Sequence, residues 1–411
     1  MLRSRYLQLA VLVVAGGAIY PLVYLRQNFE VSILESFDIS ITQLSQCYAM
    51  LGVIFVLTYL PSGWLTDRVS PRWLISVSLA MAGLLGLWFA TMPSFEMLQI
   101  IFIGWGIATG LTFWSALIKA VALLGGADKQ GRFFGILEGG RGLVEAALAT
   151  IAVAWFAYLL DSAGRSLSAS LTQVIYFYAG FMLIVAPAVL LLLDDIRPDA
   201  VPIDEKTNVW KDMKLILSKS EVWLAAFCIL SGYQLFWATY SFSAYLQQTY
   251  GMTAVAVGFI TVAKLWMRPI GAISAGIAGD FLSRETVLAS LLIAAAASLA
   301  GMVAVPATAS MGLLLAVVML VGLLTYAVRG IYWATLESCN ISDRTKGLAI
   351  GVISLIGYAP DIYLPLINAA LLERFPGKTG YAIYFMGLAA MGLIGALAAW
   401  RLGKVAALHR H

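Results

Sequence analysis

Long apolar runs, each about 18 to 25 residues in length and separated by short polar breaks, constrain this sequence more than any other feature. A run of that length crosses about 30 Å of hydrocarbon when it forms a helix. Closed barrels also satisfy their backbone in lipid, but their strands alternate apolar and polar residues. Residues 188–193 and 313–320 are apolar at every position. The runs therefore predict membrane-spanning helices.

Composition excludes an ordinary soluble domain. Hydrophobic residues make up 61% of the chain and charged residues 12%, whereas soluble domains carry about 25% charged residues. We predict an all-α integral membrane protein with twelve transmembrane helices. The expected spans are 7–28, 44–62, 73–92, 97–123, 133–160, 172–193, 222–248, 254–275, 286–305, 311–337, 345–371 and 380–402.

The longest polar stretch, residues 194–220, falls in the middle of the chain. We predict a six-helix bundle over 1–193, a cytoplasmic linker over 194–220 and a second six-helix bundle over 221–411. Most Lys and Arg residues outside the spans fall on the side of this linker and of both termini. Only Arg165, Arg374 and Lys378 fall opposite. By the positive-inside rule we expect both termini in the cytoplasm, in the inner membrane of a bacterium.

The two halves match at an internal offset of about 213 residues. Residues 63–68 align with 276–281, each at a cytoplasmic turn that follows an even-numbered span. Further on, at an offset of 216 residues, Glu145 aligns with Asp361. Matches that recur in order indicate a duplicated six-helix unit.

The segment from Gly63 to Arg72, Gly-Trp-Leu-Thr-Asp-Arg-Val-Ser-Pro-Arg, resembles the signature between helices 2 and 3 of the major facilitator superfamily. The resemblance covers essentially the whole chain and implies two pseudo-symmetric six-helix bundles. It also implies a gating motif that latches the bundles, with the subfamily unassigned. That motif comprises Gly63, Asp67, Arg68 and Arg72, and in a degraded second copy Gly276, Asp280 and Arg284.

Ionisable residues inside the spans are candidate functional residues, because a charge at mid-bilayer costs about 2.5 to 3.5 kcal/mol unless it meets a partner or a polar cavity. Glu138, Arg141 and Glu145 fall at i, i+3 and i+7, on one helix face. Glu145 and its repeat equivalent Asp361 are the expected proton-coupling residues. The alternative is a structural ion-pair network that joins this helix to the first or the eighth.

Lys264 and Arg268 share a helix face at i and i+4, and two cations together require a counter-ion. With Arg26 they could clamp a carboxylate or phosphate, which the planar fork of arginine binds bidentately. Aromatic residues on the central helices are further candidates for the cavity lining. The predicted substrate-binding residues are Arg26, Arg268, Lys264, Tyr20, Tyr24, Trp114, Tyr233, Trp237, Arg329 and Tyr358.

The duplicated architecture predicts secondary transport by alternating access, in which two bundles rock about a midplane site. The sequence has no phosphate-binding loop for nucleotide hydrolysis, so an ion gradient is the expected energy source. Cations outnumber anions inside the spans, which favours a small organic anion as substrate, and the carboxylates inside the spans favour protons as the coupling ion. The cations are Arg26, Lys119, Arg141, Lys264, Arg268 and Arg329, against Glu138, Glu145, Glu337 and Asp361.

Two other functions fit the sequence: a proton-coupled antiporter that exports neutral or cationic compounds, and a transporter-like sensor that binds without transport. An enzyme is not expected, since both histidines, His409 and His411, lie in the tail. We predict no cofactor and no metal. The expected partners are a small-molecule substrate, protons and membrane lipids, with no nucleic acid, and the protein is expected to be a monomer.

Overall fold

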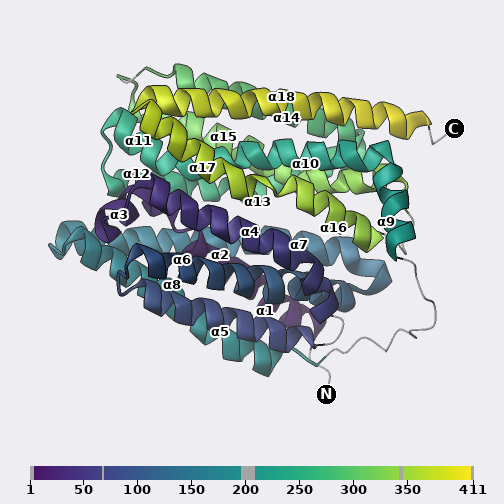
Figure 1. Cartoon of the computed structure of the whole chain (residues 1–411), viewed down its shortest axis with the longest axis horizontal. Helices are drawn as coiled ribbons and strands as arrows, with labels where there is room; N and C mark the ends of the chain where they lie inside the picture. Colours follow the sequence, from purple (N-terminus) through teal and green to yellow (C-terminus); the bar gives the residue numbers. More distant parts are fainter. Residues whose placement is uncertain (1–3, 67–68, 196–208, 307, 342–345, 409–411) are drawn as a thin grey trace. The chain divides into compact units, whose positions relative to one another are not determined.

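The computed structural model describes residues 4–66, 69–195, 209–306, 308–341 and 346–408, and these residues contain helices and no strand (Figure 1). The all-α fold predicted from the apolar runs is confirmed. The α-helices are α1 Arg5–Ala18, α2 Tyr20–Val23, α3 Arg26–Phe37, α4 Ile41–Thr66, α5 Pro71–Phe89, α6 Phe95–Gly106, α7 Ser115–Ala157, α8 Leu167–Leu192, α9 Val209–Ser218, α10 Ser220–Ala238, α11 Phe242–Tyr250, α12 Ala254–Leu265, α13 Met267–Phe281, α14 Arg284–Ala304, α15 Met311–Ile331, α16 Lys346–Gly357, α17 Pro360–Arg374 and α18 Lys378–Leu408. Four tighter or wider helical segments join them: η1 Ile107–Trp114 and η2 Tyr158–Ser162 are π-helical, and η3 Thr239–Ser241 and η4 Tyr332–Cys339 are 3₁₀-helical.

These elements form 12 stretches that are long and apolar enough to span a membrane, which confirms the predicted number. Eleven predicted spans agree with the observed stretches to within a few residues. The first does not, because the observed stretch is Arg5–Phe37 and the prediction ended it at residue 28. The polar residues 26–28 resemble the end of a span, but they are buried, and α3 continues for nine residues beyond them.

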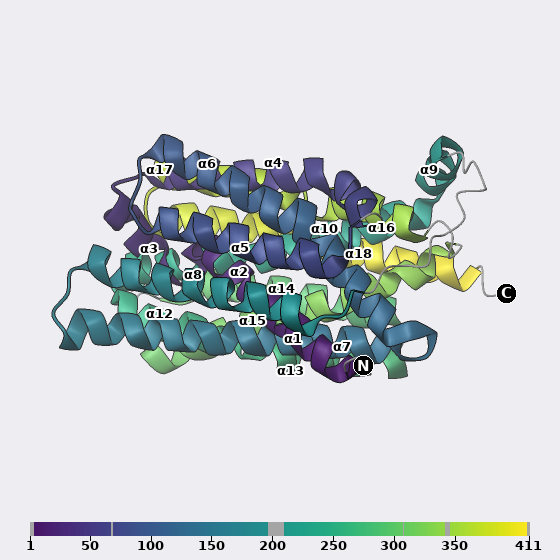
Figure 2. The same cartoon turned by 90° about the horizontal axis from the view of Figure 1, so that it is seen from below.

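Contacts divide the chain into two compact units. Unit 1 is Met1–Asp199 with Tyr240–Pro269, and unit 2 is Ala200–Thr239 with Ile270–His411. In unit 1, α5 packs on α8, α1 on α7, and α12 on both α3 and α7 (Figures 1 and 2). In unit 2, α14 and α10 both pack on α18, and α10 also packs on α16. The predicted linker between the two six-helix bundles, residues 194–220, separates the two halves of the sequence repeat. This division of the chain stays a prediction.

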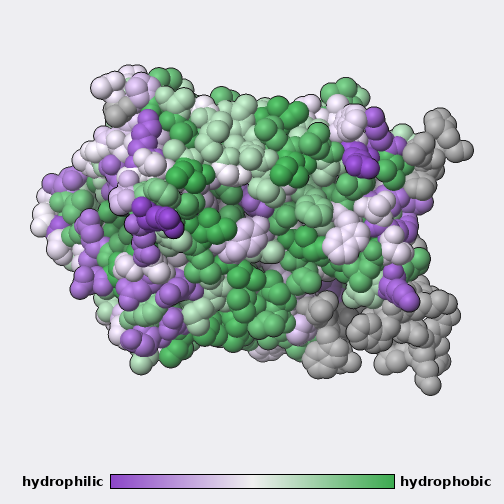
Figure 3. All heavy atoms as spheres, turned by 45° about the horizontal axis from the view of Figure 1, so that its top comes forward, coloured by the Kyte–Doolittle hydropathy of each residue, from purple (hydrophilic) through white to green (hydrophobic). Residues whose placement is uncertain are grey.

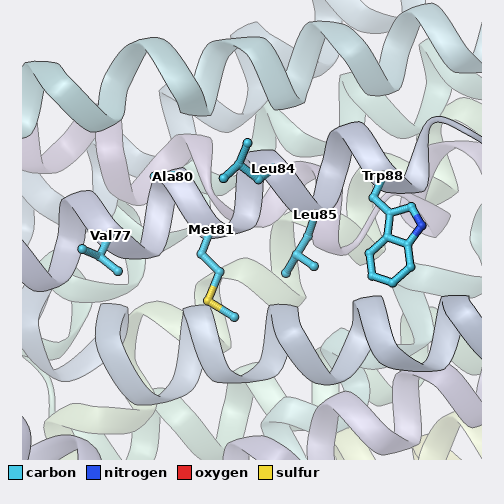
Figure 4. Close-up of a pocket in the computed structure, with 6 residues that line it drawn as sticks. All are labelled: Val77, Ala80, Met81, Leu84, Leu85 and Trp88. Carbon is cyan, nitrogen blue, oxygen red and sulfur yellow. The ribbon is translucent and has the colours of Figure 1, made fainter.

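Apolar side chains gather over the middle of the helices, with hydrophilic ones toward the helix ends (Figure 3). On α5, α8, α14 and α18 the most exposed side chains include Leu84, Ile184, Ile293 and Leu397. Exposed leucine and isoleucine on such helices are suited to contact with lipid. An apolar groove of about 480 Å³ runs along α5 and is lined by Val77, Ala80, Met81, Leu84, Leu85 and Trp88 (Figure 4). All six belong to one helix and none is charged, so the groove belongs to this apolar surface.

Glycine permits a close contact between the backbones of α13 and α15 in unit 2. A Cβ atom on Gly271 of α13 would lie 2.5 Å from the carbonyl oxygen of Leu323 and 3.0 Å from the backbone nitrogen of Ala327, both on α15. Backbone atoms cannot move aside as a flexible side chain can. Small residues that let two backbones approach are a common means of helix packing in membranes.

We predict that Gly271→Ala destabilises the protein by about 1 to 3 kcal/mol, because the added methyl group overpacks the α13–α15 contact. Thermal unfolding of the purified protein in detergent measures this loss. Gly276→Ala is the matched control on the same helix, because a Cβ atom there meets nothing within 4 Å. Equal melting temperatures for the two variants would contradict the close contact.

Candidate functional site

The charged residues of α7 form a chain of ion pairs in unit 1. Arg141 Nη1 lies 2.7 Å from Glu138 Oε1, one turn earlier on the same helix. The Arg141 Nε atom also donates to the carbonyl oxygen of Gly16 on α1, at 3.3 Å. Arg141 is buried, whereas the Glu138 side chain is 48% exposed. Arg141 therefore contacts both Gly16, where α7 packs on α1, and the accessible carboxylate of Glu138.

The eighth span adds two more cations to this row of ion pairs. Arg268 forms an ion pair with Glu145 and a longer contact of 3.7 Å with Glu138. Lys264, one turn earlier, is fully buried, interacts electrostatically with Glu145 and lies 5.6 Å from the ring centre of Phe242. The span is interrupted between the two cations, because α12 ends at Leu265 and α13 begins at Met267.

We call Glu138, Arg141, Glu145, Lys264 and Arg268 the charged cluster. The sequence placed the first three on one helix face and the last two on another, and the structure brings the two sets together. Arg268 is shared by two carboxylates. Three cations and two carboxylates give the five side chains a formal charge of +1. Because the three cations are buried, this excess favours the approach of one negative charge.

Aromatic rings lie beside the charged cluster. The Arg141 guanidinium lies 5.1 Å from the ring centre of Trp114 and 5.7 Å from that of Tyr20. Tyr24 stacks on Tyr240 with ring centres 5.1 Å apart. The Tyr20 and Tyr24 rings lie 6.4 Å apart. Three predicted aromatic residues, Tyr20, Tyr24 and Trp114, thus lie in the same unit as the charged cluster, and two of them contact Arg141 directly.

Arg26 takes a different partner from the one that the sequence suggested. Its Nε atom donates to Glu30 Oε2 at 2.6 Å, and both side chains are almost completely buried. The guanidinium also lies 5.0 Å from the ring centre of Tyr48. Glu30 escaped the sequence analysis because the first span was ended too early. The apolar residues at 29, 31, 33 and 34 were the available signal that the helix continued.

Asp361 lies at the centre of a second group, in unit 2. Its Oδ1 atom accepts hydrogen bonds from the Tyr233 hydroxyl at 2.7 Å and from Trp237 Nε1 at 2.6 Å. Both donors are on α10, and Asp361 is in the first turn of α17, directly after Pro360. The carboxylate is buried and interacts electrostatically with Arg329 of α15.

Arg329 and Tyr358 extend this second group. The Arg329 guanidinium lies 4.2 Å from the ring centre of Phe236, and Tyr358 packs edge to face on Tyr233 at 4.8 Å. The Tyr358 hydroxyl accepts from Trp333 Nε1 at 3.0 Å and shares a hydrogen bond with the Tyr332 hydroxyl at 3.3 Å. We call Tyr233, Trp237, Arg329, Tyr332, Trp333, Tyr358 and Asp361 the aromatic cluster. The sequence pointed to Tyr233, Trp237, Arg329, Tyr358 and Asp361 as functional residues. It did not predict that Tyr233 and Trp237 would donate hydrogen bonds to Asp361.

The predicted gating residues are only partly described. Asp67 and Arg68 lie outside the described residues, as does the side chain of Asp280, and Gly63 belongs to α4. Arg72 lies in the first turn of α5, with its guanidinium 5.6 Å from the ring centre of Trp73. Gly276 is in α13 and Arg284 begins α14. Just before the motif turn, Lys119 Nζ donates to the carbonyl oxygen of Thr66 at 2.9 Å, at the end of α4.

Among the described residues, no group of three His, Cys, Asp or Glu side chains could hold a metal ion. The helical spans and the buried charges together define a polytopic membrane protein. The chain belongs to the Major Facilitator Superfamily, whose family model matches residues 11–365, and it is therefore a transporter rather than an enzyme. The predicted family membership is confirmed.

Named relatives and solved structures agree with this assignment. The inner membrane protein YqcE of Escherichia coli (strain K12) is 27% identical over 401 residues, which cover 95% of this chain and 93% of YqcE. The inner membrane protein YihN of the same organism is 25% identical and covers 98% of this chain and 96% of its own length. The predicted inner-membrane location is thereby supported.

Two solved structures show the same fold. The nucleoside transporter NupG has a TM-score of 0.73 at 12% identity, with 98% of this chain and all of that chain covered. A bacterial homologue of the human lysosomal transporter Spinster, in an inward-facing and unoccupied conformation, has a TM-score of 0.73 at 14% identity and 97% coverage of both chains. At these identities the likeness establishes the fold alone.

We predict that Arg268→Gln destabilises the protein by about 3 kcal/mol, because Glu145 then loses the cation that compensates its partly buried charge. The double variant Glu145→Gln with Arg268→Gln should recover most of this loss. Thermal unfolding of the two single variants and the double variant measures the coupling. If the losses of the single variants simply add in the double variant, the pair does not act as a buried ion pair.

Proposed function

We propose that this transporter moves a small organic anion across the membrane together with protons, by alternating access. The observation that carries the proposal is the formal charge of +1 on the charged cluster, whose cations Arg141, Lys264 and Arg268 are all buried. A substrate with one carboxylate or phosphate group would compensate that charge. A cationic substrate would add to it.

Arginine is the better of the two cation types for such a group, because its planar fork donates two parallel hydrogen bonds to a carboxylate or phosphate. Arg268 already forms an ion pair with Glu145 through Nη1, and its Nη2 atom lies 3.7 Å from Glu138 Oε2. An entering anion would compete with these carboxylates for the same guanidinium. Lys264 and Arg141 would supply the surrounding positive field.

This competition supplies a route to proton coupling. Once a substrate anion takes Arg268, Glu145 is left as a partly buried carboxylate with less compensation. A proton then compensates the carboxylate in place of the guanidinium. Anion and proton cross together, and release of both on the far side restores the ion pair of Arg268 with Glu145. Asp361, the repeat equivalent of Glu145, stays a second predicted coupling residue.

A proton-coupled antiporter for neutral or cationic compounds is the alternative, and one observation favours it. Asp361 is a buried carboxylate among aromatic rings, an arrangement that also suits an organic cation. The electrostatic interaction with Arg329 counts against this alternative, because it already compensates the carboxylate.

The placement of both termini in the cytoplasm and the monomeric state stay predictions from the sequence.

Counterflow in proteoliposomes tests the substrate class. Labelled carboxylates and organophosphates are compared with labelled amines and neutral sugars. We expect exchange of at least one anion and none of the amines. Exchange of amines without any anion would replace the proposal by the antiporter alternative, and binding without exchange of any compound would indicate a sensor.

We predict that Glu145→Gln separates anion exchange from proton coupling. The amide cannot take up a proton, so exchange at equal pH should continue while accumulation driven by a pH gradient is lost. Arg268→Ala should raise the KM for the anion about 10- to 100-fold, through the loss of a charge-assisted pair of hydrogen bonds. Glu35→Gln, on an exposed carboxylate of α3, is the control. Normal pH-driven accumulation by the Glu145→Gln variant would remove Glu145 from the coupling step.

A further inference from the structure

Helix α9 of unit 2 runs across the end of a membrane span. It lies directly before α10, the first helix of the seventh span, and it is oriented crosswise to α10 (Figure 1). The view turned by 90° shows the same helix nearly end-on (Figure 2). Its packing on α10 and α16 holds it in this direction. A helix that crosses the end of a span lies along the membrane surface rather than through the membrane.

The sequence of α9 has the pattern of a helix that lies in a membrane interface. Apolar residues at 209, 210, 213, 216 and 217 recur with helical spacing, and polar residues at 211, 212, 214 and 218 separate them. Such helices place their apolar side at the boundary between headgroups and acyl chains and their lysines among the headgroups. Unit 2 covers only part of the apolar side, because Ile216 is 2% exposed and Leu217 is 41% exposed.

Leu217 continues an apolar surface of the seventh span. The Trp223 Nε1 atom of α10 donates to the carbonyl oxygen of Leu217 at 2.8 Å, so the indole ring lies beside the last turn of α9. Trp223 is exposed, and so is Phe227, one turn further along α10. Tryptophan is enriched where spans reach the membrane surface. The exposed apolar surface of α10 therefore extends onto α9.

Lys214 places a positive charge on the same side of α9 as Leu217. The two residues are three positions apart and both are exposed, and residues at this spacing are neighbours on a helix surface. A lysine lays its carbon stem along apolar surface and extends its ammonium group to the polar layer. Leu215 is also exposed, but it lies two positions from Leu217 and therefore on the opposite side of the helix.

We propose that α9 lies in the membrane interface, with Leu217 at the acyl boundary and Lys214 bound to the phosphate of an anionic phospholipid. The partner is the lipid surface rather than another protein, because the exposed residues continue the apolar surface of a span and carry a cation beside it. This inference does not depend on the transported substrate.

The residue after α9 connects this anchor to the tenth span. Lys219 Nζ donates to the carbonyl oxygen of Cys339 at 3.4 Å and to that of Asn340. These carbonyls lie at the end of η4, and the last carbonyls of a helix lack partners within it. A membrane-bound α9 therefore holds the end of the tenth span at the same surface.

Fluorescence quenching tests the position of α9. The variants Leu217→Cys and Leu215→Cys are each labelled with bimane, in vesicles of phosphatidylcholine and phosphatidylglycerol. We expect brominated phospholipid to quench the label at 217, and acrylamide, which stays in water, to quench the label at 215. Phe227→Cys is the reference for lipid, and Ala163→Cys, in an exposed turn, is the reference for water. The three native cysteines are buried, and the unsubstituted protein gives their background labelling.

Two outcomes would overturn the position proposed for α9. In the first, acrylamide quenches the label at 217 as strongly as the label at 163, so that this side of α9 faces water. In the second, neither quencher reaches the label at 217, so that protein covers it.

The choice of lipid tests the role of Lys214. Brominated phosphatidylglycerol should be enriched about fivefold over brominated phosphatidylcholine at the label on 217, which corresponds to about 1 kcal/mol for one lysine near an anionic surface. Lys214→Gln should remove this preference, and Lys214→Arg, which retains the charge, should keep it. Equal quenching by the two lipids with Lys214 present, or a preference that survives in the Lys214→Gln variant, would overturn the assignment of Lys214.

Discussion

The cost of placing a charge in hydrocarbon governs the chemistry of this chain. Each charged side chain in a span costs about 2.5 to 3.5 kcal/mol unless something compensates it. Unit 1 meets this cost in two ways. Arg26 and Glu30 form a buried pair within one helix. Arg268 is instead shared between Glu138 and Glu145, so one cation serves two carboxylates from another span. A cation shared between two carboxylates can change partners at lower cost than a cation paired with one. The proposed mechanism therefore begins at Arg268.

Interrupted helices place the functional groups. The first span is broken at Tyr24, just before Arg26, and the eighth at Trp266, between Lys264 and Arg268. The tenth and eleventh change geometry at Tyr332 and Tyr358. In transporters built from repeats, interrupted helices free backbone groups and form the sites for substrate and ions. The helices α5, α8, α14 and α18 lack comparable interior breaks and present exposed apolar residues instead.

Sequence alone was sufficient for the fold, because a helix in lipid must be long and apolar. It also identified the charged cluster, since a charge inside a span is rare enough to be noticed. The helical spacing of Glu138, Arg141 and Glu145 suggested a local bridge, and the alternative was an ion-pair network with the first or the eighth span. Neither named the partner of Glu145, which is Arg268, 123 residues away. Glu30 was missed because the polar residues before it were taken as the end of the first span. Whether such residues are buried depends on tertiary packing, which a local sequence pattern does not show.

The central claim is that an anion competes with Glu145 for Arg268 and thereby causes proton uptake. The most direct measurement is the pH of a lightly buffered solution of purified protein, followed with an indicator dye while the exchanged anion is added. The account predicts uptake of about one proton per anion bound, abolished in the Glu145→Gln variant. Saturable anion binding with no change in pH, or with proton release, would contradict it.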